Sequence, residues 1–304
     1  MTRLFILCIL LVTVVLAPCA GYGAEILKVK LLTAITGDGK EKPVLLKNPS
    51  GVTCNDKSVV VVADSDNGRL VRYSFVENVL KGGTEIKIPQ IAYPVRVQMN
   101  SKGDIYALDG KSRRIVQLNP EGTFAGYLEP QGVPAPAVIV PRSFKIAADD
   151  TIYLLDILGE RVLVLNAAGN YVNQLQFPKP YGFFSDLAVN SNGDIFLLDS
   201  VKATLFVARK NNPTFVPLVK DLKEYLNFSA NIAVDYRGVI FLTDQNGGAL
   251  VAFGQDGALL GRQLSLGWKS GQLFYPTQMC VTQSGVIFIA DRSNNRVQIF
   301  ELTK

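Results

Sequence analysis

The chain has 304 residues, of which 48% are hydrophobic and 19% are charged. This composition provides enough apolar sequence for a large core, and too little charge for a disordered or coiled-coil protein. The formal net charge of +5 is modest and no basic stripe occurs, so the composition does not favour nucleic acid as a partner.

The first 24 residues have the pattern of a secretory signal peptide. Arg3 supplies a positive charge, residues 4–17 are uncharged and largely apolar, and small residues follow in CAGYGA. An apolar run of this length is too short to form a stable membrane anchor. We therefore expect cleavage between Ala20 and Ala24, and a single mature domain at 25–304 that is periplasmic or secreted without a stable anchor.

Six copies of one fourteen-residue unit follow, and they align without a gap. Each copy ends in an aspartate, and the spacings between these aspartates are 45, 47, 43, 45 and 47 residues. In chain order the units are GVTCNDKSVVVVAD, RVQMNSKGDIYALD, SFKIAADDTIYLLD, DLAVNSNGDIFLLD, NIAVDYRGVIFLTD and QMCVTQSGVIFIAD. A fixed period of this length indicates a repeat architecture.

The columns of this alignment predict four strands per repeat. The second and fourth columns are apolar in every unit, as expected for a strand with one buried face. A turn, usually with glycine, leads to a second apolar strand that ends at the aspartate. A third alternating strand follows each aspartate, and a fourth follows in most units. The sequence therefore predicts an all-β, six-bladed β-propeller.

The sixth repeat has only three of its four strands before residue 304. The strand-like segment ILKVKLLTAI, at residues 26–35, stands at the other end of the repeat array. We expect this N-terminal strand to complete the last blade, because closure leaves no open sheet edge. The expected product is a monomeric propeller.

The segment from FYPTQMCVTQSGVIFIAD to DRSNNRVQIF, which ends at Phe300, resembles an NHL repeat. That pattern is roughly P-x-G-[IV]-A-V-D, a glycine turn, an aromatic-apolar strand and D-x-x-N-x-R-[IV]-x-x-F. The resemblance extends over the whole mature chain, although units four and five lack the opening proline and the arginine. It implies the propeller fold of a bacterial exported protein, and it leaves the activity open because NHL propellers serve both as binding platforms and as enzymes.

We interpret the repeated Asp and Arg side chains as structural. An element that recurs in each blade serves folding, whereas a site should vary between copies, so we expect each aspartate to close its own turn and each arginine to pair with it or with a neighbouring blade. The alternative is a ring of carboxylates that holds a cation. The columns contain Asp64, Arg69, Asp109, Arg114, Asp156, Arg161, Asp199, Asp244, Asp291 and Arg296.

The first column, where each inner strand begins, is instead variable and polar. It holds Gly51, Arg96, Ser143, Asp186, Asn231 and Gln278, with Gln98 and Lys145 two positions further along. The side chains of Arg96, Gln98, Lys145, Asp186, Asn231 and Gln278 are the candidate binding residues. In resembling propellers this end of the strand opens onto the ligand face. Alternatively, these groups satisfy one another and channel water.

Two loops on the same face could contact a partner. The segment 129–141 contains four prolines among apolar residues, which predicts a stiff, extended strip. The segment 265–276 contains Trp268, the only tryptophan of the chain, and we expect it and Lys269 to face solvent or a partner.

The sequence provides no evidence for a cofactor, a metal centre or catalytic residues. Histidine is absent, which removes the commonest general base and metal ligand. Lactonase propellers hold a divalent ion with acidic and amide groups, for which Asp186, Asn231 and Asp235 are weak candidates. Cys54 and Cys280 fall in columns that point to opposite faces of equivalent strands, so we expect two free and mostly buried thiols.

These observations favour an exported, non-catalytic binding or assembly module. Its expected partner is a protein of the cell envelope or of an exported complex, bound through the loop-rich channel face. The second hypothesis is a lactonase-like hydrolase or lyase that uses a divalent metal at the channel mouth. RNA binding, known for some cytoplasmic NHL proteins, is opposed by the signal peptide and the mild charge.

Overall fold

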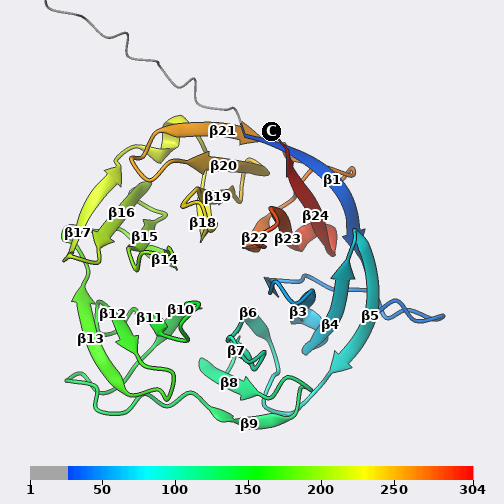
Figure 1. The fold of residues 1–304 in the computed structure, drawn as a ribbon, viewed down its shortest axis with the longest axis horizontal. Helices are drawn as coiled ribbons and strands as arrows, with labels where there is room; N and C mark the ends of the chain where they lie inside the picture. Colours follow the sequence, from blue (N-terminus) through cyan, green and yellow to red (C-terminus); the bar gives the residue numbers. More distant parts are fainter. Residues whose placement is uncertain (1–26, 304) are drawn as a thin grey trace, which may run out of the picture.

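The structure is a computed structural model that describes residues 27–303. Six four-stranded antiparallel sheets stand around a central axis, each running from an inner strand to an outer strand at the rim (Figure 1). The prediction of a six-bladed β-propeller is confirmed. The expected signal peptide and its cleavage site lie outside the described residues.

The strands of each blade follow one another in the sequence, except in blade 6. From axis to rim, blade 1 contains β2 (Gly51–Cys54), β3 (Val59–Asp64), β4 (Arg69–Val76) and β5 (Val79–Ile86). Blade 2 contains β6 (Pro94–Met99), β7 (Ile105–Asp109), β8 (Arg114–Leu118) and β9 (Phe124–Tyr127). Blade 3 contains β10 (Pro141–Ile146), β11 (Ile152–Asp156), β12 (Arg161–Leu165) and β13 (Tyr171–Gln176).

The remaining blades have the same order. Blade 4 contains β14 (Phe184–Val189), β15 (Ile195–Asp199), β16 (Thr204–Arg209) and β17 (Asn212–Val219). Blade 5 contains β18 (Ser229–Val234), β19 (Ile240–Asp244), β20 (Ala249–Phe253) and β21 (Leu259–Gln263). Blade 6 contains β22 (Pro276–Val281), β23 (Val286–Asp291), β24 (Arg296–Thr303) and, as its outer strand, β1 (Lys28–Ile35).

The N-terminal strand completes the last blade, as the sequence predicts. β1 pairs antiparallel with β24, from Lys28 opposite Thr303 to Ile35 opposite Val297. The ring is therefore closed by strands from both ends of the described chain, and the third strand of blade 6 has no free edge.

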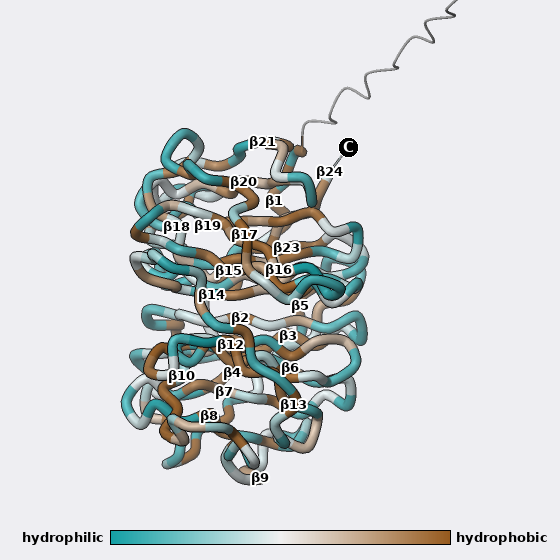
Figure 2. Tube along the Cα trace, turned by 90° about the vertical axis from the view of Figure 1, so that its left-hand side faces the viewer, coloured by the Kyte–Doolittle hydropathy of each residue, from teal (hydrophilic) through white to brown (hydrophobic). Residues whose placement is uncertain are grey.

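The core consists of apolar layers between neighbouring blades. The six buried clusters each combine residues from two adjacent sheets, and the second-column side chain of every blade belongs to one of them. Figure 2 shows the hydrophobic stretches in the blade strands and the more hydrophilic ones at the turns. The even-numbered columns of one blade thus face the odd-numbered columns of the blade before it.

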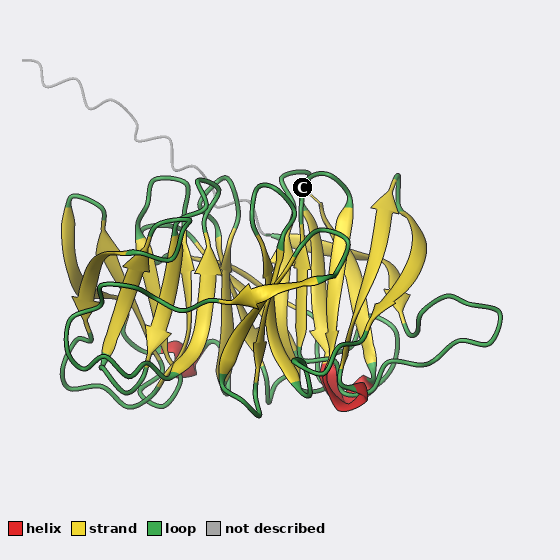
Figure 3. Ribbon diagram, turned by 90° about the horizontal axis from the view of Figure 1, so that it is seen from below, coloured by secondary structure: helices red, strands yellow, loops and turns green. Residues whose placement is uncertain are grey.

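Two faces lie at the ends of the strands. The mouth face, our name for the lower edge in Figure 3, carries the loops that enter each inner strand and the turns after each repeat aspartate. The short 3-10 helices η1 (Ser65–Asn67), η2 (Leu222–Glu224) and η3 (Arg292–Asn294) lie on it. The opposite edge, the hairpin face, carries the other turns. Within residues 27–303, no helix is long and apolar enough to cross a membrane.

Candidate functional site

The six repeat aspartates are buried structural anchors on the mouth face. Each is at most 1% exposed and accepts a backbone N–H from the loop that enters its own blade, 16 or 17 residues upstream, at 2.5–3.1 Å. Asp109, Asp199 and Asp244 also accept N–H groups within their own turns. The sequence suggests only that each aspartate closes its own turn. In the structure the aspartates also bind the loop that enters the blade, so they join that loop to the turn.

Three of the four repeat arginines pair with the aspartate of their blade. The Nε–Oδ2 distances are 2.7 Å for Arg69–Asp64, 3.0 Å for Arg161–Asp156 and 2.7 Å for Arg296–Asp291.

Arg114 differs from these three and from our expectation. It binds the exposed Glu129 at 2.6 Å and lies 3.4 Å from the centre of the Tyr127 ring. The turn before it leaves the Asp109 carboxylate bound to the Ser112 N–H. Blade 5 has no arginine in this column, and there Arg262 of the outer strand approaches Asp244 to 3.7 Å.

Most first-column residues form a hydrogen-bonded ring around the axis. The Asp186 carboxylate of blade 4 accepts from the Ser143 hydroxyl of blade 3 and from the Asn231 amide of blade 5. It also accepts the Ile232 N–H at 3.1 Å, and the Asn231 Oδ1 accepts the Met279 N–H of blade 6 at 2.9 Å. The ring therefore fixes the inner strands of four consecutive blades.

Gln278 extends the ring past blade 1 to blade 2. Its amide exchanges two hydrogen bonds with the backbone of Val97, at 3.1 and 2.8 Å. Blade 1 has Gly51 at this position, where an added Cβ would lie 2.8 Å from the Gln278 Oε1. The absence of a side chain at Gly51 thus leaves the space that Gln278 occupies.

A pocket of about 280 Å³ opens at the channel mouth beside this ring. All six blades contribute to it, and its thirteen lining residues are aromatic, arginine, small or amide residues without a carboxylate. They are Ser50, Tyr93, Val95, Arg96, Arg142, Phe183, Ser185, Phe228, Ala230, Gln245, Tyr275, Thr277 and Arg292. We call this the mouth pocket.

The three arginines of the mouth pocket are held in different ways. Arg96 donates from Nη2 to the Ala230 carbonyl across the axis at 3.3 Å, and Arg292 donates from Nη2 to the Tyr93 hydroxyl at 3.1 Å. Arg142 lies 5.2 Å from the centre of the Phe183 ring. Desolvation at the mouth and then repulsion by Arg96 lower the pKa of Arg142, while Asp186 acts in the opposite direction. Arg142 is therefore partly desolvated and lies close enough to both Arg96 and Asp186 to be influenced by each.

Lys145 and Gln98 belong to the inner strands but do not line the mouth pocket. Desolvation lowers the pKa of Lys145, and attraction to Asp186 opposes that change. Among the candidate binding residues, the structure brings Asp186, Asn231 and Gln278 into the ring, and only Arg96 lines the pocket.

The sequence reasoning missed most of the mouth pocket. Arg142 precedes the first column by one position, and Arg292 directly follows the repeat aspartate, so both lie just outside the aligned unit. One sequence pattern could have indicated the pocket: in four of the six blades an aromatic residue stands three positions before the first column. These residues are Tyr93, Phe183, Phe228 and Tyr275.

The two candidate loops border the mouth face, and only Tyr275 of the segment 265–276 lines the pocket. Trp268 is 77% exposed and Val138 of the proline-rich segment is 66% exposed. Val133 and Ile139 of that segment pack on the layer between blades 2 and 3, and Arg161 donates to the carbonyls of Pro134 and Pro136. The segment is thus an anchored strip that is only partly exposed.

The expectation of two free thiols is wrong. Cys54 and Cys280 form a disulfide between the inner strands of blades 1 and 6, with a Cα–Cα distance of 5.9 Å. The columns do point to opposite faces of equivalent strands. However, blades pack face to face, so opposite faces of neighbouring blades meet, and this geometry places the two sulfur atoms together.

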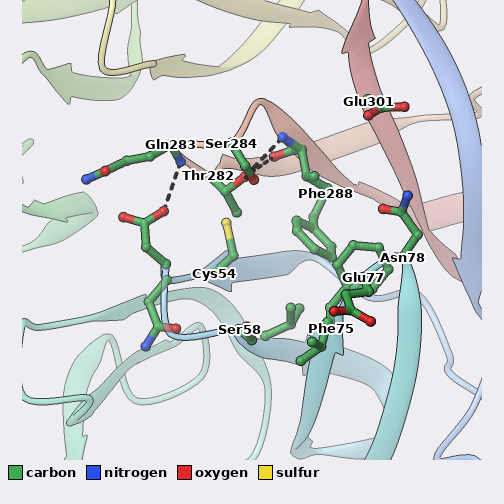
Figure 4. A pocket seen from close by; sticks show the side chains of 15 residues that line it. Cys54, Ser58, Phe75, Glu77, Asn78, Thr282, Gln283, Ser284, Phe288 and Glu301 are labelled. Atoms are coloured by element: carbon green, nitrogen blue, oxygen red, sulfur yellow. Dashed lines mark hydrogen bonds between the residues drawn. The ribbon is translucent and has the colours of Figure 1, made fainter.

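A second pocket, of about 470 Å³, lies beside Cys54 on the hairpin face. Figure 4 shows its polar wall, which includes Thr282, Gln283 and Ser284, and the apolar side chains of Phe75 and Phe288. Because Glu77 and Glu301 also line it, its charge is opposite to that of the mouth pocket.

The weak metal candidates are not gathered at one point. Asp186 and Asn231 are in contact, whereas Asp235 follows β18 at its other end and pairs with Arg237 at 2.7 Å. Within the part of the chain that the structure describes, no group of three or more His, Cys, Asp or Glu side chains could hold a metal ion.

Comparison with known proteins defines the class of this chain. The model of the NHL repeat family matches residues 275–300, within blade 6. The chain is thus a six-bladed β-propeller with an NHL repeat. No curated protein matches it.

Solved propellers with different names share the fold. A virginiamycin B lyase from Staphylococcus aureus is 12% identical, with a TM-score of 0.59 over 91% of this chain and 100% of the other. A gluconolactonase from Xanthomonas campestris is 12% identical, with a TM-score of 0.64 over 93% of both chains. The WD40 propeller domain of Doa1 is 11% identical, with a TM-score of 0.60 over 91% and 98%. At these identities the similarity shows the fold alone.

Proposed function

We propose that this propeller is an exported, non-catalytic binding module that engages a protein partner through its mouth face. The main support for this proposal is the distribution of exposed apolar side chains over the surface. Of the eighteen large hydrophobic residues exposed among residues 27–303, eleven lie in the loops and turns of the mouth face. They are Val44, Leu45, Val138, Ile157, Leu158, Phe183, Val201, Leu266, Trp268, Phe274 and Tyr275.

This asymmetry supports docking through one face. The turns of the hairpin face expose only Val76, Val79 and Tyr236 from the same set of described residues, and the rest are on outer strands. Apolar side chains gathered on one surface mark interaction sites more often than scattered ones do. The Cys54–Cys280 disulfide supports the export part of the proposal, because disulfides persist in oxidising compartments.

Site-specific photo-crosslinking tests the proposal. A photoreactive phenylalanine at Trp268 should give one discrete protein adduct in intact cells. The matched control places the same group at Tyr236, which is 60% exposed on the hairpin face, and should give no such adduct. Equal adducts from both positions, or none from Trp268, would contradict docking through the mouth face.

A lactonase-like hydrolase or lyase is the second candidate. It is favoured by the similarity to the gluconolactonase fold and by the Asp186–Asn231 contact near the channel mouth. Metal analysis of the purified protein discriminates between the two. A stoichiometric Ca²⁺, Mn²⁺ or Zn²⁺ ion that is lost in Asp186→Asn would support the enzyme and count against the binding module.

A further inference from the structure

The mouth pocket combines positive charge with aromatic walls at the centre of the mouth face. Arg96, Arg142 and Arg292 line it, and none of its lining residues in the described chain is acidic. Asp109, Asp199 and Asp244 do not line it but accept the backbone N–H groups of Tyr93, Phe183 and Phe228, and a further carboxylate, that of Asp186, lies nearby. Its carboxylate oxygens are already engaged by Ser143, Asn231 and the Ile232 N–H. The charged side chains that line the pocket are therefore all arginines, and the oxygens of the nearby Asp186 are occupied.

Two of these arginines are fixed before any ligand arrives. Arg96 is 9% exposed and bound to the Ala230 carbonyl, and Arg292 is bound to the Tyr93 hydroxyl. The Nε of Arg292 is buried and has no hydrogen-bond partner within residues 27–303. A buried donor without a partner is unfavourable, so an acceptor supplied by a ligand would stabilise it.

The third arginine, Arg142, is accessible to a ligand that approaches from solvent. Arg142 is exposed as a residue although its guanidinium group is partly desolvated, and its neighbour Phe183 lines the mouth pocket and is 37% exposed. Guanidinium groups bind carboxylates through paired N–H donors, and such pairs are stronger than neutral hydrogen bonds. The pocket thus offers a fixed floor and an accessible side for one carboxylate.

The geometry points to a carboxylate side chain of the docking protein, flanked by apolar residues, as the occupant of the mouth pocket. This inference rests on the proposed function, since it names the chemistry by which that partner is recognised. Arginine and tyrosine at the centre of an apolar surface are the arrangement that dominates protein interfaces energetically. A free small anion would leave the exposed apolar side chains of the mouth face uncovered.

Binding of two blocked, fluorescein-labelled peptides tests the inference. One alternates leucine with glutamate and the other alternates leucine with glutamine, and anisotropy reports their affinity for the purified protein. The glutamate peptide should bind at least about tenfold more tightly. Arg142→Gln should remove most of that difference, because Arg96 and Arg292 already bind protein groups and Arg142 is the accessible guanidinium, and its exposed position should leave the fold intact.

Lys102→Gln is the matched control, since it removes one positive charge from an exposed turn of the hairpin face. It should leave the affinity for the glutamate peptide unchanged. Equal binding of both peptides would overturn the inference, as would competition by inorganic phosphate or glutarate at the affinity of the peptide. The latter result would indicate a small-anion pocket.

Different results would contradict the proposed function and the carboxylate inference. If the Trp268 adduct persists while neither peptide binds and Arg142→Gln leaves the adduct unchanged, docking stands and the carboxylate anchor is wrong. If the adduct is absent, the proposed function fails whatever the peptides do. If the adduct forms in the wild type and is reduced by Arg142→Gln but not by Lys102→Gln, both are supported.

Discussion

Asp291 shows how a repeated residue is used in this fold. Its Oδ1 accepts the Phe274 N–H at 2.7 Å, and its Oδ2 accepts from Arg296 at 2.7 Å and from Gln298 at 3.0 Å. The carboxylate is fully buried, while the Arg296 side chain is 13% exposed. A negative charge in such a place is stable only because every contact is made together.

The first prediction concerns this carboxylate. Asp291→Ala should lower the free energy of unfolding by about 3–5 kcal/mol, because it leaves Arg296 without its partner and the loop N–H unsatisfied. Thermal melting checks it. Glu121→Gln, an exposed change on a hairpin, is the control and should leave the melting temperature unchanged. An unaltered melting temperature of Asp291→Ala would show that this anchor is not structural.

The sequence predicted only those residues of the candidate site that belong to the columns of the repeat alignment. Period-two alternation defined the inner strands, and so Arg96, Asp186, Asn231 and Gln278 were recognised as polar groups near the axis. Arg142 and Arg292 were not, because nothing in a single column shows which loop residues turn toward the mouth. That orientation depends on how the entering loops are tied down by the repeat aspartates.

At the scale of elements, β1 is the one strand described that is distant in sequence from the other three strands of its blade. The alternating pattern of residues 26–35, together with the missing fourth strand of the last repeat, was sufficient to predict its position. Its Ile35 is 1% exposed and belongs to the layer between blades 6 and 1. β1 is thus fixed by packing as well as by its hydrogen bonds to β24.

Ile35→Ala should therefore destabilise the protein by about 2–5 kcal/mol, the usual cost of a cavity in a well-packed core. Denaturant unfolding followed by circular dichroism measures this. Lys30→Ala on the same strand is exposed and serves as the control, with an expected change below about 0.5 kcal/mol. Equal effects of both substitutions would mean that the strand is held by its backbone alone.

At the scale of the whole molecule, face-to-face packing of the blades explains both the success and the error of the sequence reasoning. The same alternation that predicts six apolar layers also brings Cys54 and Cys280 together. Treating the strands one at a time hid this, because the relation between two blades is a property of the assembled ring. The disulfide joins residues separated by 226 positions across the closing interface.

Replacing both cysteines by serine should lower stability without opening the ring, since neither cysteine lies on β1 or β24, the strands whose pairing closes it. A crosslink over so long a loop contributes roughly 2–5 kcal/mol in the chain-entropy view. Melting of a protein limited to residues 25–304, which excludes Cys8 and Cys19, with and without reductant checks this. The wild type should lose stability on reduction, whereas the double variant should not respond. Two reactive thiols in unreduced, denatured wild type would contradict the disulfide.

Closure by both ends also sets an order of events in folding. Blades 1 to 5 consist of strands that are consecutive in sequence, so each can form from local pairings. Blade 6 forms only when Lys28 pairs with Thr303, and this pair has the largest sequence separation of any strand pairing described. Contacts of such separation form slowly, because the chain between them must first be brought together. We therefore expect β1, the first of the described strands, to pair last, and until then the edge of β24 would be open to a strand from another molecule.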